Sequence, residues 1–201
     1  MRFNCIYSDS TFPNLILLPF INRIDKPFSG IFGKIGKRKD GFEKPSCLVA
    51  DVGNGTMNTL YLVNGKPQSG KMFTEKFGTY QCTLAIREGF MRKTRRELND
   101  YIIDEVLQTG TADIPDSDLE IITAIAEEYV AEIFRRLREH GYDESTMTLC
   151  VCGGGGCLIK NFYHGNLDHV KFINDICAAA KGYEYLADVY LRAEAKNEGR
   201  V

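Results

Sequence analysis

Apolar residues gather in short runs that are separated by glycine-containing turns and by longer segments of helical spacing. The runs Cys47–Ala50 and Thr148–Cys152 are almost wholly apolar, which predicts strands covered on both faces. Thr59–Val63 predicts a second strand and Lys71–Phe77 a third, and the Asn64-Gly65 pair between them is a strong signal for a two-residue hairpin. The pattern therefore predicts a strand, a tight glycine turn and a returning hairpin.

Between the third strand and Thr148 the apolar residues recur every three or four positions, which predicts helices. A helical stretch opens at Gly78-Thr79 and continues over Glu97–Gln108, with Gly110 as its stop. The residues expected on one face are Tyr80, Leu84 and Met91 in its first part, and Leu98, Ile102 and Val106 in its second.

A longer helix is predicted from Ser117, which forms a capping box with Glu120, to about His140, with Gly141 as its stop. Its apolar stripe is Leu119, Ile122, Ala126, Tyr129, Ile133 and Leu137. A short helix, a short strand and a final helix are expected after the second buried strand, at Cys157–Phe162, Val170–Ile173 and Ile176–Ala195.

Residues 1–45 have a weaker pattern, with a strand at Leu15–Leu18 and a short helix at Pro27–Ile35 as the best predictions. The apolar run Leu15–Ile21 contains a proline, is too short to span a bilayer and lacks a small-residue cleavage site. We therefore expect neither a signal peptide nor a membrane partner.

The composition fits one domain, or two small subdomains sharing a core. The chain has 201 residues, 44% of them apolar, with a net charge of −2 and a pI near 6.0. No direct contact with nucleic acid is required by this charge. The basic clusters Lys37–Lys39 and Arg92–Arg96 fit solvated ends, or a contact surface for another subunit or for DNA.

The cysteines point to a reducing, cytoplasmic environment, because the seven of them follow no disulfide spacing. Cys150, Cys152 and Cys157 with His164 and His169 could be read as zinc ligands. However, no C-x-x-C pair exists, and small thiols are common in cores, which favours buried structural cysteines.

The first candidate site is the turn after Cys47–Ala50. Gly53, Asn54, Gly55 and Thr56 are candidate nucleotide-binding residues, because glycine lets backbone amides approach phosphate oxygens and the threonine adds a hydroxyl. Asp51, at the strand end, is the candidate catalytic residue and could hold a water or a hydrated Mg²⁺. An ordinary hairpin turn is the alternative for this motif.

The second candidate site follows Thr148–Cys152 and consists of Gly153, Gly154, Gly155 and Gly156. Backbone without side chains, leading into a helix N-terminus, suits a purine, a ribose or a phosphate. A tight strand-to-helix crossover is the alternative. The spacing is not that of a dinucleotide fingerprint, because Leu158 stands where the third glycine is required.

Three segments together resemble the second half of the bacterial actin-like ATPases of the plasmid-segregation ParM/StbA kind. Leu48–Asn58 resembles the second phosphate loop of that family, Leu149–Leu158 its adenosine motif, and Asn174–Tyr183 its closing segment. The resemblance covers roughly residues 46–193.

The resemblance implies a ribonuclease-H-like α/β fold of the actin ATPase type, with a mixed sheet, flanking helices and a helical insertion at about 79–140. Residues 46–201 would form the nucleotide-binding domain, and residues 1–45 a remnant of the first lobe or a linker. The resemblance also implies binding of ATP or GTP with Mg²⁺, and cytoplasmic filaments that move plasmid DNA through a separate DNA-binding adaptor protein.

The sequence departs from the family pattern at several positions. Asn58 replaces the acidic residue that ends the phosphate motif, Cys157 replaces a small alanine, and Pro27 lacks the neighbouring Glu or Gln that orients the attacking water. The first phosphate loop is also missing. Two expectations follow: the chain is a truncated product or fragment, which we favour, or it is a divergent protein with an improvised first lobe.

Half a cleft leaves the phosphates open to water, so we expect weak nucleotide binding and slow hydrolysis by this chain alone. We also expect Leu15–Ile21 and the loop ends near Asp51 to be exposed apolar surface that promotes association. The alternative function is a non-catalytic interaction module that binds a filament or an adaptor. A small-molecule kinase is a third option, although no substrate pocket or acceptor base is recognisable.

Overall fold

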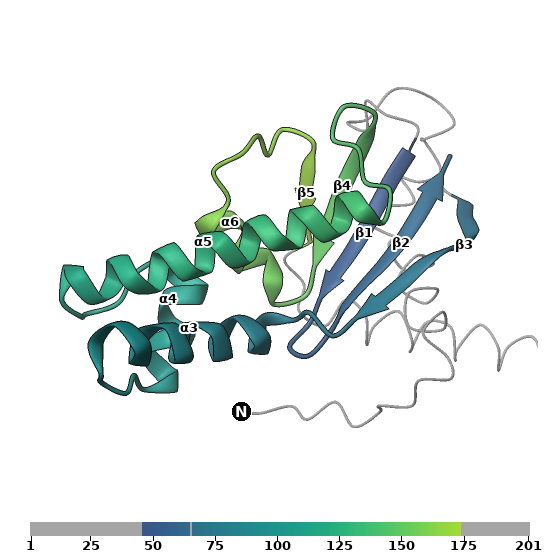
Figure 1. Cartoon of the computed structure of the whole chain (residues 1–201). Coiled ribbons are helices and arrows are strands. Elements are labelled where there is room, and N and C mark those ends of the chain that lie inside the picture. Colours follow the sequence, from purple (N-terminus) through teal and green to yellow (C-terminus); the bar gives the residue numbers. More distant parts are fainter. Residues whose placement is uncertain (1–45, 65, 174–201) are drawn as a thin grey trace, which may run out of the picture.

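The strands of the chain pair into one mixed sheet, with the helices set against it and beyond its end (Figure 1). The computed structural model describes residues 46–64 and 66–173. Several predicted segments lie outside the described residues: the strand Leu15–Leu18, the helices Pro27–Ile35 and Ile176–Ala195, the apolar run Leu15–Ile21 and the closing segment Asn174–Tyr183.

The sheet has the strand order β3-β2-β1-β4-β5. β1 pairs antiparallel with β2, and β2 antiparallel with β3, whereas β4 runs parallel to both β1 and β5. The mixed sheet with flanking helices is therefore confirmed. The strand bounds are Ser46–Val52 for β1, Met57–Val63 for β2, Lys66–Glu75 for β3, Met147–Cys152 for β4 and Val170–Phe172 for β5.

The central strand β1 is buried on both faces, as its continuous apolar sequence predicts. Leu48, Ala50 and Val52 join the main core on the helix side, while Cys47 and Val49 belong to a smaller cluster on the other side. Each of these side chains is at most 2% exposed. The alternation follows from the two-residue period of a strand.

The hairpin between β2 and β3 turns where the sequence predicts it. β2 ends at Val63 and β3 begins at Lys66, the two residues pair, and Asn64 adopts a positive φ of 50°. β3 starts earlier than the predicted Lys71, because its pairing with β2 continues across a register irregularity near Leu62.

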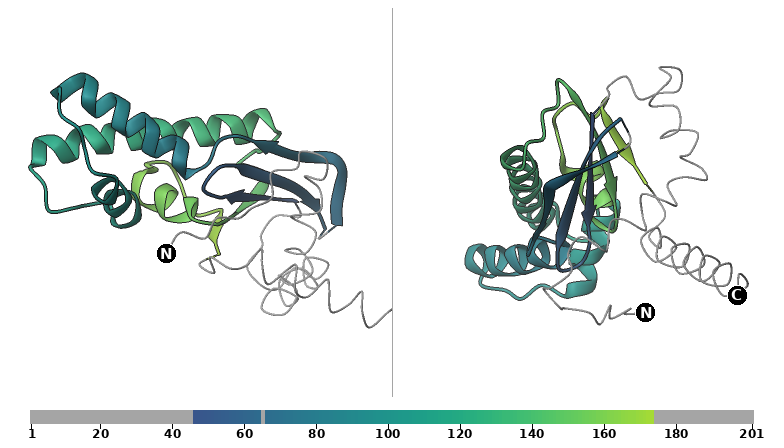
Figure 2. Two further views of the ribbon diagram at one scale, coloured as in Figure 1. Left: turned by 90° about the horizontal axis from the view of Figure 1, so that it is seen from below. Right: turned by 90° about the vertical axis from the view of Figure 1, so that its right-hand side faces the viewer.

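Three helices connect β3 to β4, and a fourth follows β4. α3 and α5 lie side by side and extend beyond the end of the sheet (Figures 1 and 2). Their close approach needs Gly89, because a Cβ there would lie 2.5 Å from Cδ1 of Ile125. The bounds are Thr79–Thr94 for α3, Asp100–Thr109 for α4, Asp116–Glu139 for α5 and Gly155–Phe162 for α6.

The predicted core face of α3 is wrong. Tyr80 and Leu84 are 46% and 39% exposed, and Cys82, Ile86 and Phe90 form the buried face instead. Both sets recur every four residues, so helical spacing alone does not separate them. The choice depends on which side of α3 meets α5.

The helix predicted at Glu97–Gln108 is α4, which begins later, at Asp100. α3 ends at the left-handed residue Arg95, so the chain needs a short connection before α4 starts. Of the predicted core residues, Val106 is fully buried, while Leu98 and Ile102 are partly buried. The deepest residues of α4 are Ile103, Val106 and Leu107.

The capping box predicted at Ser117 is also wrong. α5 begins at Asp116 with Pro115 in the capping position and no side-chain cap. Proline suits a helix start because its missing amide would be unpaired there. Asp118, inside the predicted box, is buried and forms an ion pair with Arg96.

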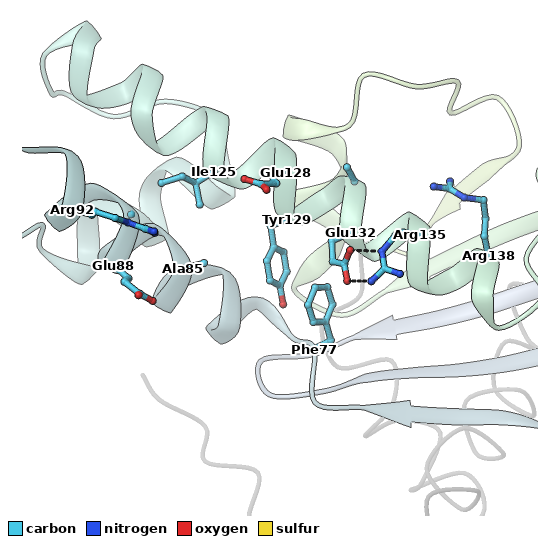
Figure 3. A pocket seen from close by; sticks show the side chains of 12 residues that line it. Phe77, Ala85, Glu88, Arg92, Ile125, Glu128, Tyr129, Glu132, Arg135 and Arg138 are labelled. Atoms are coloured by element: carbon cyan, nitrogen blue, oxygen red, sulfur yellow. Dashed lines mark hydrogen bonds and ion pairs between the residues drawn. The ribbon is translucent and has the colours of Figure 1, made fainter.

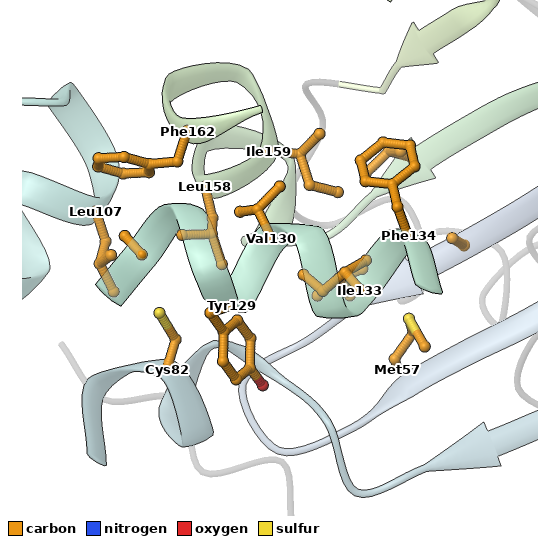
Figure 4. Packing of buried hydrophobic residues seen from close by; sticks show 14 of the residues in the cluster. Met57, Cys82, Leu107, Tyr129, Val130, Ile133, Phe134, Leu158, Ile159 and Phe162 are labelled. Atoms are coloured by element: carbon orange, nitrogen blue, oxygen red, sulfur yellow. The ribbon is translucent and has the colours of Figure 1, made fainter. Parts of the chain in front are cut away.

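The apolar stripe predicted for α5 forms the centre of the core (Figure 4). Val130 and Phe134 are also buried and widen this stripe. The prediction left them out because it followed a single line of residues spaced three or four apart. The buried residues of the predicted stripe are Ile122, Ala126, Tyr129, Ile133 and Leu137, with Leu119 partly buried. No helix in the described part of the chain is long and apolar enough to cross a membrane.

Candidate functional site

The two glycine loops lie at the same edge of the sheet. β1 and β4 are adjacent and parallel, with Asp51 paired to Cys152, so both strands end at that edge. The loop after β1, residues 53–56, and the loop after β4, which starts at Gly153, therefore face the same space. Crevices outside the carboxyl ends of neighbouring parallel strands are common ligand sites in α/β proteins.

The first loop is held to the start of α3 by its carbonyl groups. The Thr79 amide donates to the Gly53 oxygen at 2.9 Å, and the Tyr80 amide to the Asn54 oxygen at 2.8 Å. The Gly53 amide is used inside the turn, where it donates to the Thr56 oxygen at 2.9 Å.

The remaining amides of this loop have no acceptor in the part of the chain that the structure describes. Those of Asn54, Gly55 and Thr56 donate to no other described residue, and Asn54 and Gly55 are exposed. An added Cβ at Gly55 would meet nothing within 4 Å. Within the described part of the chain these three amides are therefore left as donors, and Asn54 and Gly55 lie on the exposed side of the loop.

Glycine has a different structural role at each of the four positions of the second loop. Gly153 has a φ of +80°, and a Cβ there would lie 2.7 Å from Oδ1 of Asp51. A Cβ on Gly155 would lie 2.3 Å from Cγ1 of Val52, whereas Gly154 faces open space. At Gly156 a Cβ would make an ordinary contact with Phe172. Packing therefore explains Gly153 and Gly155, while Gly154 is open to a ligand.

The short helix predicted at Cys157 begins earlier, at Gly155, with Gly154 in the capping position. Gly155 and Gly156 thus lie in the first turn of α6 rather than in the loop. The close contact with Val52 leaves no room for a side chain at Gly155, so glycine is tolerated inside the helix despite its low helix propensity.

Asp51 lies near the end of β1, just before the first loop, and pairs with Cys152, just before the second; its Oδ1 would be 2.7 Å from a Cβ on Gly153. Burial raises the pKa of its carboxyl group, and contact with the Cys152 thiol only partly offsets this. Burial, with Asp51 nearby, also raises the pKa of Cys152, so the thiol stays neutral. A carboxylate whose charged form is disfavoured by its surroundings gains from a cationic partner.

A polar row crosses the sheet beside Asp51. Asn58 pairs directly with Asp51 across β1 and β2, and Thr74 pairs with Asn58 across β2 and β3. The Thr74 hydroxyl donates to Oδ1 of Asn58 at 2.8 Å, and Nδ2 of Asn58 lies 3.5 Å from the Thr56 hydroxyl. The sequence motif includes Asn58 but not Thr74, because only the register of the hairpin places Thr74 beside it.

Gly78 is a second residue that sequence analysis assigned only to a helix start. A Cβ there would lie 2.5 Å from the Asn54 oxygen, so only glycine lets α3 begin against the first loop. Its amide donates to Oε1 of Gln81 and its carbonyl accepts from the Tyr129 hydroxyl, each at 2.8 Å. Tyr129 was predicted only as a core residue.

A shallow groove of about 690 Å³ lies between α3 and α5 (Figure 3). Its walls carry arginines and glutamates, and no residue of the two glycine loops lines it. Two of its lining residues lie next to Gly78: Phe77 precedes it and Tyr129 bonds to it, and their rings stack with centroids 4.4 Å apart. Among the described residues, no group of three or more His, Cys, Asp or Glu side chains could hold a metal ion.

With this strand order, the hairpin after β1 and the glycine turn after the parallel strand β4, the chain shares its fold with solved actin-like proteins. No family model matches the sequence, and no curated protein matches it. The similarity is visible in solved structures, at identities that establish the fold alone.

Among these structures is the pCBH ParM non-polymerisable quadruple mutant, with a TM-score of 0.61 and 14% identity over 85% of this chain and 52% of that one. The archaeal actin homologue Ta0583 gives a TM-score of 0.55 and 20% identity over 80% and 54%. Bacillus thuringiensis ParM with AMPPNP gives 0.53 and 12% over 74% and 48%. The chain thus spans about half the length of the structures it matches.

Proposed function

We propose that this chain is the nucleotide-binding part of an actin-like filament protein and binds ATP, or GTP, with Mg²⁺ across its two glycine loops. The observation that carries the proposal is the meeting of the two loops at one sheet edge, with Asp51 just before the first of them. The similar Bacillus thuringiensis ParM has been solved with AMPPNP, ADP and ATP, which supports a nucleotide as the ligand.

The residues present fit such a ligand. The amides of Asn54, Gly55 and Thr56 would hold phosphate oxygens, and the flat backbone at Gly154 would lie against the nucleoside. Asp51 would hold the hydrated Mg²⁺, an ion that commonly keeps several waters and needs only one or two protein carboxylates. When bound, Mg²⁺ supplies positive charge that offsets the charge of the phosphates.

Titration with a fluorescent ATP analogue, with and without Mg²⁺, tests the proposal. We expect saturable but weak binding, with a Kd above about 1 μM, because the described donors approach the phosphates from one sheet edge only. Mg²⁺ should tighten it, and unlabelled ATP should displace the analogue. Absence of any saturable binding to the folded chain would overturn the proposal.

A filament partner and a role in plasmid segregation belong to the same proposal. The similar structures include a 15-stranded ParM filament from Clostridium botulinum, with a TM-score of 0.54 and 17% identity over 77% of this chain and 50% of that one. Self-association into filaments is therefore the proposed assembly, with a separate DNA-binding adaptor connecting it to DNA.

A second candidate is a non-catalytic module that joins a filament or an adaptor without using a nucleotide. The specific observation in its favour is that the row across the sheet offers Asp51 no second carboxylate, because its neighbours there, Asn58 and Thr74, are uncharged. This candidate predicts that the chain co-sediments with filaments of a full-length ParM protein equally well with and without ATP–Mg²⁺. Co-sedimentation that depends on nucleotide would contradict it.

A further inference from the structure

A set of hydrogen bonds joins the first glycine loop to α3 and α5. The carbonyl oxygens of Gly53 and Asn54 accept from the first two amides of α3, those of Thr79 and Tyr80. Those amides would otherwise be unpaired, because the first turn of a helix has no internal acceptors for them. The loop therefore caps α3 with its backbone.

This capping decides which way the free amides of the loop point. The carbonyl of one residue and the amide of the next belong to one planar unit and point in opposite directions. Since the Gly53 and Asn54 carbonyls point at α3, the amides of Asn54 and Gly55 point away from it. These are two of the donors that the proposed function assigns to phosphate.

The start of α3 is itself held from α5. The Tyr129 hydroxyl donates to the Gly78 carbonyl in a buried bond of 2.8 Å, across 51 positions of sequence. The Tyr129 ring lies beside Phe77, which fixes its direction (Figure 3). Burial raises the pKa of Tyr129, so its hydroxyl stays a donor at all ordinary pH values.

We propose that Tyr129 is a positioning residue for phosphate binding: its hydroxyl holds Gly78, and Gly78 and α3 hold the first loop with its amides turned to the ligand. The inference rests on the proposed function and deepens it. Gln81 acts in the same direction, because its side chain accepts from the Gly78 amide. Neither side chain would touch the nucleotide.

The Tyr129→Phe variant tests this, since it removes the hydroxyl and keeps the ring in the core. Binding of ATP–Mg²⁺ and of adenosine is measured by displacement of a fluorescent analogue. We expect ATP to bind about three- to thirtyfold more weakly, as for one lost hydrogen bond, and adenosine to change less than about twofold. If Tyr129 had only a structural role, the variant would bind both ATP and adenosine more weakly. Weaker binding of ATP alone therefore indicates an effect on the phosphate contacts.

The matched control is Tyr163→Phe, because the Tyr163 ring stacks on Phe134 of α5 at 3.8 Å and has no described contact with either loop. It should leave both affinities unchanged. If Tyr129→Phe strongly lowers the melting temperature, Gln81→Leu serves as the test variant instead. It too should weaken the binding of ATP but not that of adenosine.

The inference is overturned if the wild type binds ATP and Tyr129→Phe binds it equally well, or loses ATP and adenosine to the same extent. If the folded wild type binds no nucleotide, the proposed function fails instead. The two failures are thus distinguished by the wild-type titration alone.

Discussion

At the scale of single residues, Asp51 has surroundings that disfavour its charge, and it is the carboxylate of the proposed nucleotide site. Burial raises its pKa, so the folded state disfavours the carboxylate. Residues with such shifts cluster at functional sites, where stability is given up for binding. Stability and ligand binding should therefore respond to a substitution here in opposite directions.

We predict that Asp51→Asn raises the melting temperature near pH 7 by about 2–4 °C and abolishes the tightening of ATP binding by Mg²⁺. Because the pKa is raised, the carboxyl group favours folding only where it is protonated, and that contribution is lost as pH rises through the folded pKa. The advantage of the variant should therefore vanish below the ordinary pKa of 3.8. Thermal unfolding of both proteins across this pH range measures it; a variant less stable at pH 7 would refute the burial argument.

Substitutions at two neighbouring glycines distinguish an effect on packing from an effect on ligand binding. Gly155→Ala forces a Cβ against Val52 and should lower the free energy of unfolding by about 1–3 kcal/mol. Gly154→Ala meets nothing and should change it by less than about 0.5 kcal/mol, yet weaken ATP binding because the methyl group enters the ligand space.

Urea unfolding and nucleotide titration of these two variants and the wild type provide the measurement. Equal stability of Gly154→Ala and Gly155→Ala would contradict the close contact with Val52. Unchanged ATP affinity in Gly154→Ala would place the ligand elsewhere.

At the scale of elements, β3 is fastened to the end of α5 through Glu75. Its carboxylate contacts both Arg136 and His140. Aromatic contacts reinforce the joint, with Phe73 stacked on His140 at 4.2 Å and Arg136 over the Phe77 ring at 4.1 Å. The joint holds the end of α5 against β3, the outer strand of the sheet.

We predict that Glu75→Gln lowers the free energy of unfolding by about 1–2 kcal/mol near pH 7. Burial disfavours the Glu75 charge, but the hydrogen bonds from His140 and Arg136 outweigh it, so the pKa is lowered. A lowered pKa stabilises the fold above the ordinary value of 4.5, and this contribution is lost as pH falls through the folded pKa. Urea unfolding of wild type and variant from neutral to acid pH checks this.

The control for that series is Glu139→Gln, at an exposed ion pair with Arg135 on the same helix. Exposed pairs contribute little, so its effect should stay below about 0.5 kcal/mol at every pH. A Glu75→Gln effect that is equally small, or that does not shrink in acid, would show that the joint is not electrostatic.

At the scale of the whole molecule, the proposed filament role predicts assembly that depends on nucleotide. We expect light scattering of the chain to rise on addition of ATP–Mg²⁺, and Asp51→Ala to abolish the rise. The reason is that a ligand on the loop that caps α3 would favour one arrangement of α3 and its neighbouring helices over others. Scattering that is unaffected by nucleotide, in a chain that binds ATP, would contradict nucleotide-controlled assembly.

The sequence by itself determined the central strands, the turns after them and the stripe of α5. These features are local: a continuous apolar run fits a strand buried on both faces, and glycine permits backbone conformations and contacts that a Cβ forbids. The residues of both glycine loops, and the resemblance to actin-like ATPases, could therefore be read without coordinates. The shared edge of β1 and β4 agrees with that prediction.

Only the tertiary structure decided which side of α3 is buried and where α5 begins. It also decided that Tyr129 bonds to Gly78 and Thr74 to Asn58. Each of these depends on contacts between segments far apart in sequence. Cys82 and Leu84 are both apolar, and helical spacing allows either of them to face the core. Only the packing of α3 against α5 decides that Cys82 is buried and Leu84 exposed. The physical reason is that the buried face of a helix and the register of a strand depend on the element that packs against them. A local sequence pattern does not specify which element that is.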